Sequence, residues 1–390
     1  MLRAHKLPIL FLLAALMPWA IAAPRVVLSR VTVDQLNQLL DSLQQKHDAD
    51  AARAIATLEL TERPDAERVA HWKGEIQGRR ASAALLAVVD GAAFLGLPAA
   101  DVPADPAPDA QAQAGIMARA QEYVKKTVPR LPNFSALRSS TDFELASPDA
   151  LAGEQFDSQF FKSKAAKSVT LRREDLGAVT TVPSGDLFLD GVWEHTVTYR
   201  DGKEIEDAPP AAGSSHAEPT LLNSTGEFGP ILSIMTDDLA RGKVTWGRWE
   251  RSANSTLAVF RFEVPREFAH YAMQNSMSGD LELPAYHGEI AIDPATGVID
   301  RMAIEAWLHG PSAAEESGIA VEYGTVMIGG NAYICPVHGV AFLKLFTPYI
   351  DEDAQPAPAP WYGSLNDVTF TQYHVFRAES RILPENGPGV

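Results

Sequence analysis

Hydrophobic residues follow two different periods in the two halves of the chain. From about residue 34 to residue 131 they recur every three to four positions, as Leu36, Leu39, Leu40 and Leu43 do, which places them on one stripe of a helix. This pattern predicts five helices, beginning near Thr32, Ala49, Pro64, Arg79 and Asp109. A proline-rich stretch, residues 95–108, separates the last two because proline cannot continue a helix. We therefore expect a small all-helical module over residues 24–134.

After about residue 135 the period changes to two, which is typical of strands with one buried face. Trp193, Val197 and Tyr199 alternate with polar residues, and the run ends at Asp201-Gly202, a preferred hairpin turn. Further alternating runs start near residues 258, 286, 302, 319, 333 and 368. A single helix over residues 230–241, with Pro230 at its start, interrupts them.

Many antiparallel strands with short turns and one helix indicate a curved sheet rather than a parallel α/β fold. The predicted fold class is therefore α+β. The helical module precedes a curved antiparallel sheet or incomplete barrel over residues 135–383, and the helix near 230–241 acts as its lid. Residues 384–390 form a tail.

The N-terminal residues 1–23 have the three parts of a secretory signal peptide. Arg3 and Lys6 precede an apolar stretch, and Ala20-Ile21-Ala22 gives a small-x-small cleavage site. The alternative is a retained anchor, but the stretch is short for a membrane span and contains Pro18. We expect cleavage, hence an exported protein, periplasmic or extracellular, that does not span a membrane.

Composition narrows the classes of partner. The formal net charge is −17, and no lysine- or arginine-rich stripe occurs, so we expect no nucleic-acid binding. The chain has one cysteine and cannot form an internal disulfide. We expect Cys335, in the run Tyr333–Val337, to be a buried, inert thiol.

No motif for nucleotide, zinc or serine-hydrolase chemistry is present, so we expect no cofactor, no metal ligand set and no assigned catalytic residue. The strongest polar pattern is His287-Gly288-Glu289, whose two polar side chains share one strand face. The outer face of a half-buried strand explains it equally. An acid/base or metal site there would need His270, His338 or His374 to lie beside His287.

Large aromatic residues concentrate on the predicted strands of the second half. On a curved sheet they either fill the core or line an apolar cavity. The candidate ligand-binding residues are Trp193, Trp246, Phe260, Phe262, Trp307 and Tyr323.

Several segments resemble those of uncharacterised secreted bacterial proteins. They are Gly226–Leu232, Trp246–Glu250, Ala258–Phe262, Tyr286–Glu289 and Tyr373–Arg377. More distantly, the order of an Asp-Gly hairpin, a short helix and hairpins with an Asp-Pro-x-Thr-Gly turn, within about residues 140–383, is similar to the periplasmic lipoprotein-carrier (LolA/RseB-like) fold. That resemblance implies an unclosed antiparallel barrel with a helical lid that holds acyl chains. It assigns no binding residue here.

Three hypotheses for function follow. The first is a non-enzymatic binder of an apolar or lipid-like ligand in the concave sheet. The second is a protein–protein interaction module that uses a groove on the helical part, and the third is a hydrolase with a site around His287 and Glu289.

Overall fold

The structure is a computed structural model that describes residues 29–146, 186–206, 227–252, 255–274, 281–309, 314–346 and 361–375. The predicted signal peptide and tail lie outside these residues. No helix in the described ranges is long and apolar enough to cross a membrane.

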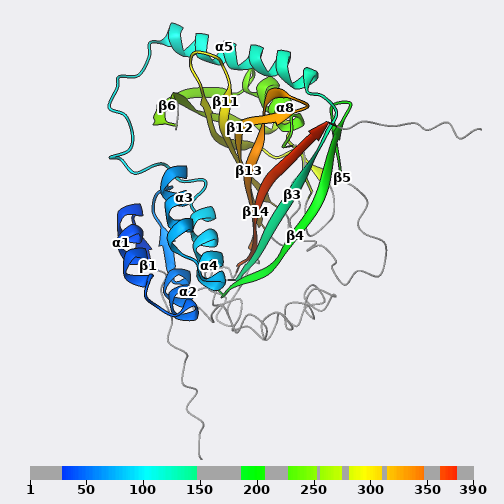
Figure 1. Cartoon of the computed structure of the whole chain (residues 1–390). Helices are drawn as coiled ribbons and strands as arrows, with labels where there is room; N and C mark the ends of the chain where they lie inside the picture. Colours follow the sequence, from blue (N-terminus) through cyan, green and yellow to red (C-terminus); the bar gives the residue numbers. More distant parts are fainter. Residues whose placement is uncertain are drawn as a thin grey trace, which may run out of the picture.

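The fold is mixed, with a few helices and one large antiparallel sheet that does not close into a barrel (Figure 1). This confirms the predicted fold class. The helices are α1 (Val33–Leu43), α2 (Asp48–Ala56), α3 (Ala66–Glu75), α4 (Arg79–Asp90), α5 (Ala110–Thr127) and α8 (Pro230–Leu239), with short 3₁₀ turns at Val128–Arg130 and Arg266–Phe268.

The main sheet has ten strands in the order β5-β4-β3-β14-β13-β12-β11-β10-β7-β6. Their bounds are β3 (Phe134–Ala146), β4 (Asp186–Arg200), β5 (Lys203–Glu206), β6 (Lys243–Arg251), β7 (Thr256–Val264), β10 (Tyr286–Ile292), β11 (Ile299–His309), β12 (Ala314–Ile328), β13 (Asn331–Phe346) and β14 (Trp361–Val375). Two short pairs lie outside it, the parallel β1 (Ser29–Val31) and β2 (Leu58–Leu60) and the antiparallel β8 (Met273–Gln274) and β9 (Leu281–Glu282).

Local signals explain most element boundaries. Thr32 and Gln35 form a reciprocal capping box at the start of α1. Helix α3 begins two residues later than Pro64, because the Asp65 side chain caps it by accepting a hydrogen bond from the Arg68 amide. The β4–β5 turn has positive φ at both Asp201 and Gly202, as the Asp-Gly pair predicts.

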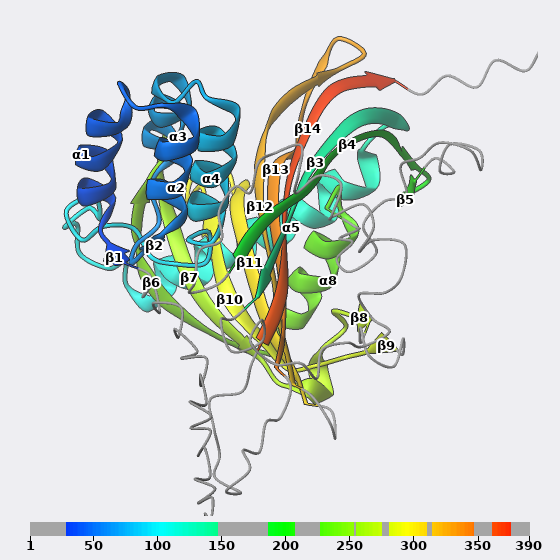
Figure 2. The same cartoon turned by 90° about the horizontal axis from the view of Figure 1, so that it is seen from below.

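Helices α1–α4 pack around a core of their own that includes Leu36, Leu40, Trp72 and Leu85, and these four helices are called the helical module below. Figure 2 shows this module on one side of the sheet and α8 on the other. Helix α4 attaches the module to the sheet through Ala87, which belongs to one cluster with Phe143 and Phe342. The face that carries the module is called the outer face below.

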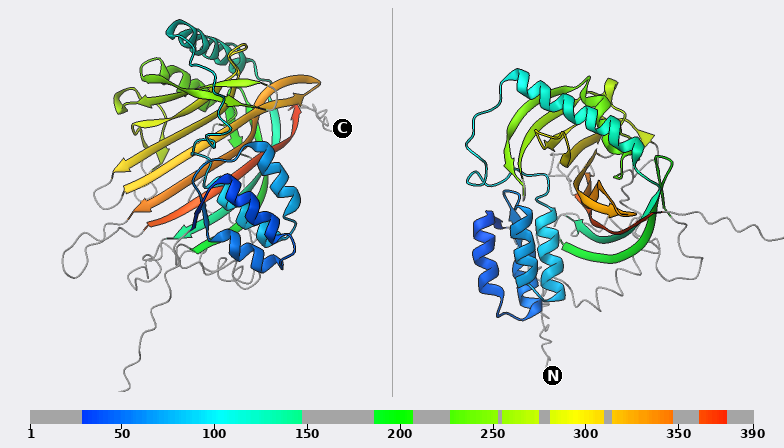
Figure 3. Two further views of the ribbon diagram at one scale, coloured as in Figure 1. Left: turned by 90° about the vertical axis from the view of Figure 1, so that its left-hand side faces the viewer. Right: turned by 45° about the horizontal axis from the view of Figure 1, so that its top comes forward.

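Helix α5 differs from the expectation that it belongs to the module. Its buried residues Ile116, Ala120 and Val124 belong to the core of the sheet domain instead. The helix crosses one end of the coiled sheet, far from α1 and α2 (Figure 3). The proline-rich stretch supplies the length that this displacement needs.

Candidate functional site

The inner face of the sheet, which lies opposite the helical module, is an apolar layer. Alternate residues of β7, β10, β11 and β12 point to it, because each strand has one buried apolar face. They include Ala258, Phe260, Phe262, Val264, Ile290, Ile292, Met302, Ile304, Ile319, Val321 and Tyr323. The alternation read from the sequence for β7 and β11 is therefore confirmed.

Two helices cover this layer. Helix α8 contributes Ile231, Leu232 and Leu239, and α5 contributes its three buried residues to the same cluster. Helix α5 is held at the β10–β11 turn, where the Arg119 Nε donates to the Pro294 carbonyl over 2.9 Å. At Gly297, which has φ +79°, an added Cβ would lie 2.5 Å from the Arg119 backbone. The turn glycine thus allows α5 to approach the sheet closely.

A buried carboxylate holds α8 to the sheet. Asp238 is fully buried and accepts hydrogen bonds from the Tyr286 hydroxyl and the His270 amide, each over 2.8 Å. The His270 Nδ1 lies 2.5 Å from the other carboxylate oxygen. Burial and the neighbouring Asp238 raise the pKa of Tyr286, so its hydroxyl remains a donor.

A second aromatic cluster lies at the other end of the inner face. Phe228, just before α8, packs edge-on against Phe134 and Phe370, at ring-centroid distances of 5.2 and 4.9 Å. Tyr199 and Tyr373 complete the group. These rings are not among the candidate ligand-binding residues predicted from the sequence. A bulge in β14, where Gln372 has φ +51°, brings Tyr373 and Val375 onto this face and leaves His374 exposed. Unbroken alternation from Val368 and Phe370 would instead place His374 on this face.

The structure brings four of the six candidate ligand-binding residues together. Phe260, Phe262 and Tyr323 are buried in the inner layer, and Trp246 packs against it with its ring 5.5 Å from that of Phe260. Trp193 is half-buried farther along the sheet, on the face of β4 that carries Val197 and Tyr199. Trp307 points to the outer face of β11 and is 42% exposed. Ligand binding by these rings stays a prediction.

An open cleft of about 880 Å³ lies beside Trp307, at the ends of β7, β10 and β11. Charged residues including Lys243, Glu263, Arg266 and Glu305 line it together with Trp307. Its mixed lining is less suited to an apolar ligand than the inner layer is.

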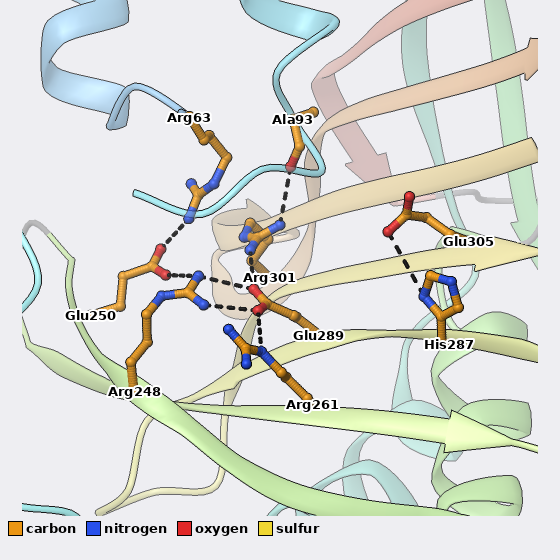
Figure 4. Close-up of polar contacts among 9 residues, drawn as sticks. All are labelled: Arg63, Ala93, Arg248, Glu250, Arg261, His287, Glu289, Arg301 and Glu305. Atoms are coloured by element: carbon orange, nitrogen blue, oxygen red, sulfur yellow. Dashed lines mark hydrogen bonds and ion pairs between the residues drawn. The ribbon is translucent and has the colours of Figure 1, made fainter. Parts of the chain in front are cut away.

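The outer face carries a network of buried ion pairs between the module and the sheet (Figure 4). Arg248 forms a two-pronged pair with Glu289, with distances of 2.8 and 2.9 Å, and also pairs with Glu250. Arg63, from the loop before α3, pairs with Glu250, and Arg301 contacts Glu289. The network therefore joins β6, β10 and β11 to the helical module.

The arginines of this network keep the Glu289 side chain in its charged form. Burial by itself would raise the pKa of Glu289, but the hydrogen bonds and charges of Arg248 and Arg301 outweigh it and hold the pKa below the usual range. A carboxylate fixed by arginines in this way is a poor general base.

In the part of the chain that the structure describes, His287 does not belong to a group of three side chains that could hold a metal ion. His287 shares the outer face with Glu289, but its nearest charged partner is Glu305, at 3.9 Å (Figure 4). His270 pairs with Asp238, and His338 with Asp367 and Glu322. Among the described residues, the one group of three histidine, cysteine or acidic side chains with ligand atoms within 4.8 Å of one another is Asp90, His338 and Asp367.

Cys335 is buried in the second aromatic cluster, and burial raises the pKa of its thiol to about 12. The expected burial of the thiol is confirmed, and its inertness stays a prediction. The large exposed hydrophobic residues of the described ranges all lie outside residues 34–131, and a partner-binding groove on the helical part stays a prediction. They are Val192, Ile205, Leu281, Leu283, Trp307 and Met327.

Comparison with family models and with curated protein sequences gives no match. The resemblance to uncharacterised secreted proteins therefore stays a prediction. Among solved structures, the chain is similar to a LolA superfamily protein from Nitrosomonas europaea, with 9% sequence identity. The match covers 69% of this chain and 94% of that protein, at a TM-score of 0.24, a weak and distant similarity.

Proposed function

We propose that this protein is an exported, non-enzymatic binder of an apolar or lipid-like ligand, which enters between the inner face of the sheet and α5. One observation carries the proposal. A continuous apolar layer lines an unclosed sheet, and the helix across its end, α5, packs on it with three buried side chains and the partly buried Met117 and Tyr123. Phe260, Phe262, Tyr323 and Trp246 would contact the ligand, and Trp193 would extend the site along the sheet.

The free energy gained by burying a long acyl chain exceeds the free energy lost when α5 leaves the inner layer. Exposing Ile116, Ala120 and Val124, together with the partly buried Met117 and Tyr123, costs on the order of 6–8 kcal/mol, at about 1.5–3 kcal/mol for each fully buried large apolar side chain. Burying an acyl chain of about sixteen carbons contributes on the order of 12 kcal/mol, at ~0.8 kcal/mol per methylene. A long-chain ligand therefore outweighs the loss of helix packing, and a short-chain ligand does not.

The test combines native mass spectrometry of residues 24–390 with titration of a fluorescent long-chain fatty acid. Trp246 and Trp249, whose rings lie 4.8 Å apart, provide energy transfer to the probe. We expect saturable binding of one probe per chain. Ile116→Asp, which weakens the α5 packing, should speed association severalfold, and Ala118→Asp on the exposed face of α5 should leave it unchanged.

The variant Trp307→Ala distinguishes binding of the probe in the inner layer from binding in the open cleft. We expect unaltered probe affinity, because Trp307 lies on the outer face. Loss of binding in this variant would move the site to the cleft. Absence of saturable binding in all variants, with no apolar mass extracted from the purified protein, would refute the proposed function.

A further inference from the structure

A cavity separates the helical module from the outer face of the sheet. It has a volume of about 290 Å³ and is lined by α3, α4 and the strands β11–β14. Its charged lining residues are Arg63, Lys73, Asp90, Arg301, Glu322 and His338. The cavity lies on the face opposite the proposed apolar site.

Three side chains from separate elements meet beside this cavity, and two of them, Asp90 and His338, line it. Asp90 is the last residue of α4, His338 lies on β13 and Asp367 on β14. The His338 Nε2 is 2.7 Å from an Asp367 oxygen, and one ligand atom from each of the three residues lies within 4.8 Å of the others. Glu322 faces the opposite ring nitrogen, with its oxygen 3.5 Å from Nδ1.

Asp90 is the member of this group that protein contacts do not satisfy. Its side chain is almost completely buried, at 2% exposure, and its Oδ2 has no hydrogen-bond partner. Its position at the C-terminal end of α4 places the anion at the unfavourable end of the helix dipole. The missing hydrogen-bond partner and the helix end both favour a cation at Oδ2.

The cations near the cavity do not fill this role. Arg63 and Arg301 are engaged with Glu250 and Glu289, and Lys73 forms no ion pair with Asp90. A protonated His338 accounts for the contacts to Asp367 and Glu322, but it leaves the Asp90 Oδ2 unpartnered. A buried orphan carboxylate oxygen in a protein cavity is costly and rare.

We propose that Asp90, His338 and Asp367 bind a divalent transition-metal ion in this cavity. One imidazole and two carboxylates form a donor set that such ions accept, and the cavity leaves room for water or a small ligand at the remaining positions. Glu322 then accepts the Nδ1 proton of His338 and fixes the ring orientation, as carboxylates commonly do behind a metal-bound histidine. The metal would hold α4 against β13 and β14.

The experiment uses residues 24–390, treated with EDTA and dialysed, and titrated with zinc chloride by calorimetry. We expect one zinc ion per chain and a rise in the melting temperature. Asp90→Asn should reduce zinc affinity at least 100-fold while leaving the fold intact, because the neutral amide has the shape of the carboxyl. Glu322→Gln should reduce affinity about 10- to 100-fold and keep the stoichiometry.

The pair His287 and Glu305 provides a matched control on the same outer face, with 3.9 Å between ring nitrogen and carboxylate. The double variant His287→Gln, Glu305→Gln should bind zinc like the parent chain. Absence of zinc binding, unchanged affinity in Asp90→Asn, or equal loss in the control would overturn the proposal. Calcium binding without zinc binding would overturn the assignment to a transition metal. Since the two sites occupy opposite faces, these outcomes are independent of fatty-acid binding.

Discussion

The Tyr286 hydroxyl on β10 donates a 2.8 Å hydrogen bond to Asp238 on α8, so the covering helix is tied to the sheet by one buried carboxylate. This contact crosses the boundary between helix and inner layer. It therefore gives a direct measure of how strongly α8 is attached, separately from the packing of apolar side chains.

Removing that hydroxyl should lower stability measurably. Tyr286→Phe deletes a hydrogen bond to a charged acceptor, which typically contributes about 1.5–3 kcal/mol. Urea unfolding should show a loss of that size. Tyr271→Phe is the control, since its ring lies 5.7 Å from that of Tyr286 and its hydroxyl does not bond to Asp238. Equal effects of the two substitutions would contradict the role of the Tyr286 bond.

Breaking the buried network on the outer face should lower the free energy of unfolding far more than breaking a surface ion pair does. Glu289→Gln leaves Arg248 and Arg301 without their shared carboxylate, and breaking a buried pair costs about 3–5 kcal/mol. Glu263→Gln breaks the exposed pair with Lys243 and should cost about 0–1 kcal/mol. Chemical denaturation of both variants tests the difference, and similar losses would show that the network contributes little.

The close approach of α5 should depend on Gly297. Gly297→Ala adds both a left-handed backbone strain and a clash with the Arg119 backbone. At Gly330, φ is +87° and an added Cβ meets nothing within 4 Å, so Gly330→Ala isolates the backbone cost, about 1 kcal/mol. We expect faster amide exchange in α5 only in Gly297→Ala. Equal exchange in both variants would show that the turn does not hold the helix.

One carboxylate should make the protein less stable as pH rises. Burial, followed by the charges of Glu322 and Glu250, raises the pKa of Asp300 to about 6. Between pH 4 and 6 the unfolded chain loses this proton while the folded protein retains it, so this group's contribution to folding falls with rising pH. Asp300→Asn should remove that decline and add about 1 kcal/mol at pH 7, after allowance for solvent screening.

Thermal unfolding of Asp300→Asn across pH 4–7 checks this sign. The exposed Asp237→Asn is the control and should follow the parent curve. If the stability of the parent protein does not fall with rising pH, or if Asp300→Asn does not remove that fall, the predicted titration is wrong.

Cys335 should resist thiol reagents in the folded state. The thiolate is the reactive form, and a buried thiol with a pKa of about 12 supplies almost none at pH 8. Reaction with Ellman's reagent should therefore follow unfolding in urea. Ala118→Cys, on the exposed side of α5, should react at once in the native protein and verify the assay. Rapid labelling of Cys335 without urea would show that the inner layer opens readily.

Local pattern predicted the elements because their signals lie within a few residues. Thr32 with Gln35, and Asp201 with Gly202, suffice to start a helix and to close a hairpin. The bulge at Gln372 was not predictable in this way. Its single extra residue reverses which face His374 and Tyr373 occupy, and alternation alone continues through it.

Placement across the fold was harder to predict than element type. The apolar stripe of α5 is the same whether it packs on other helices or on a sheet, so the sequence could not separate it from the helical module. The grouping of Asp90 with His338 and Asp367 depends on where α4 lies against β13 and β14, and these residues are far apart in sequence. The sequence does show that His287 and Glu289 lie on one face, because the two residues are only two positions apart on the same strand.

The path of residues 91–109 toward α5 also affects the edges of the sheet. The Trp249 Nε1 on the outermost strand β6 donates to the Pro106 carbonyl over 3.0 Å, so a proline-rich segment with few free amides lies against that strand. At the opposite edge, β5 is only four residues long and carries Lys203, Glu204 and Glu206. Short charged edges and covered edges both resist strand addition from another molecule. The proline-rich segment therefore limits strand addition along β6, and the short charged β5 limits it along the Val197–Arg200 end of β4.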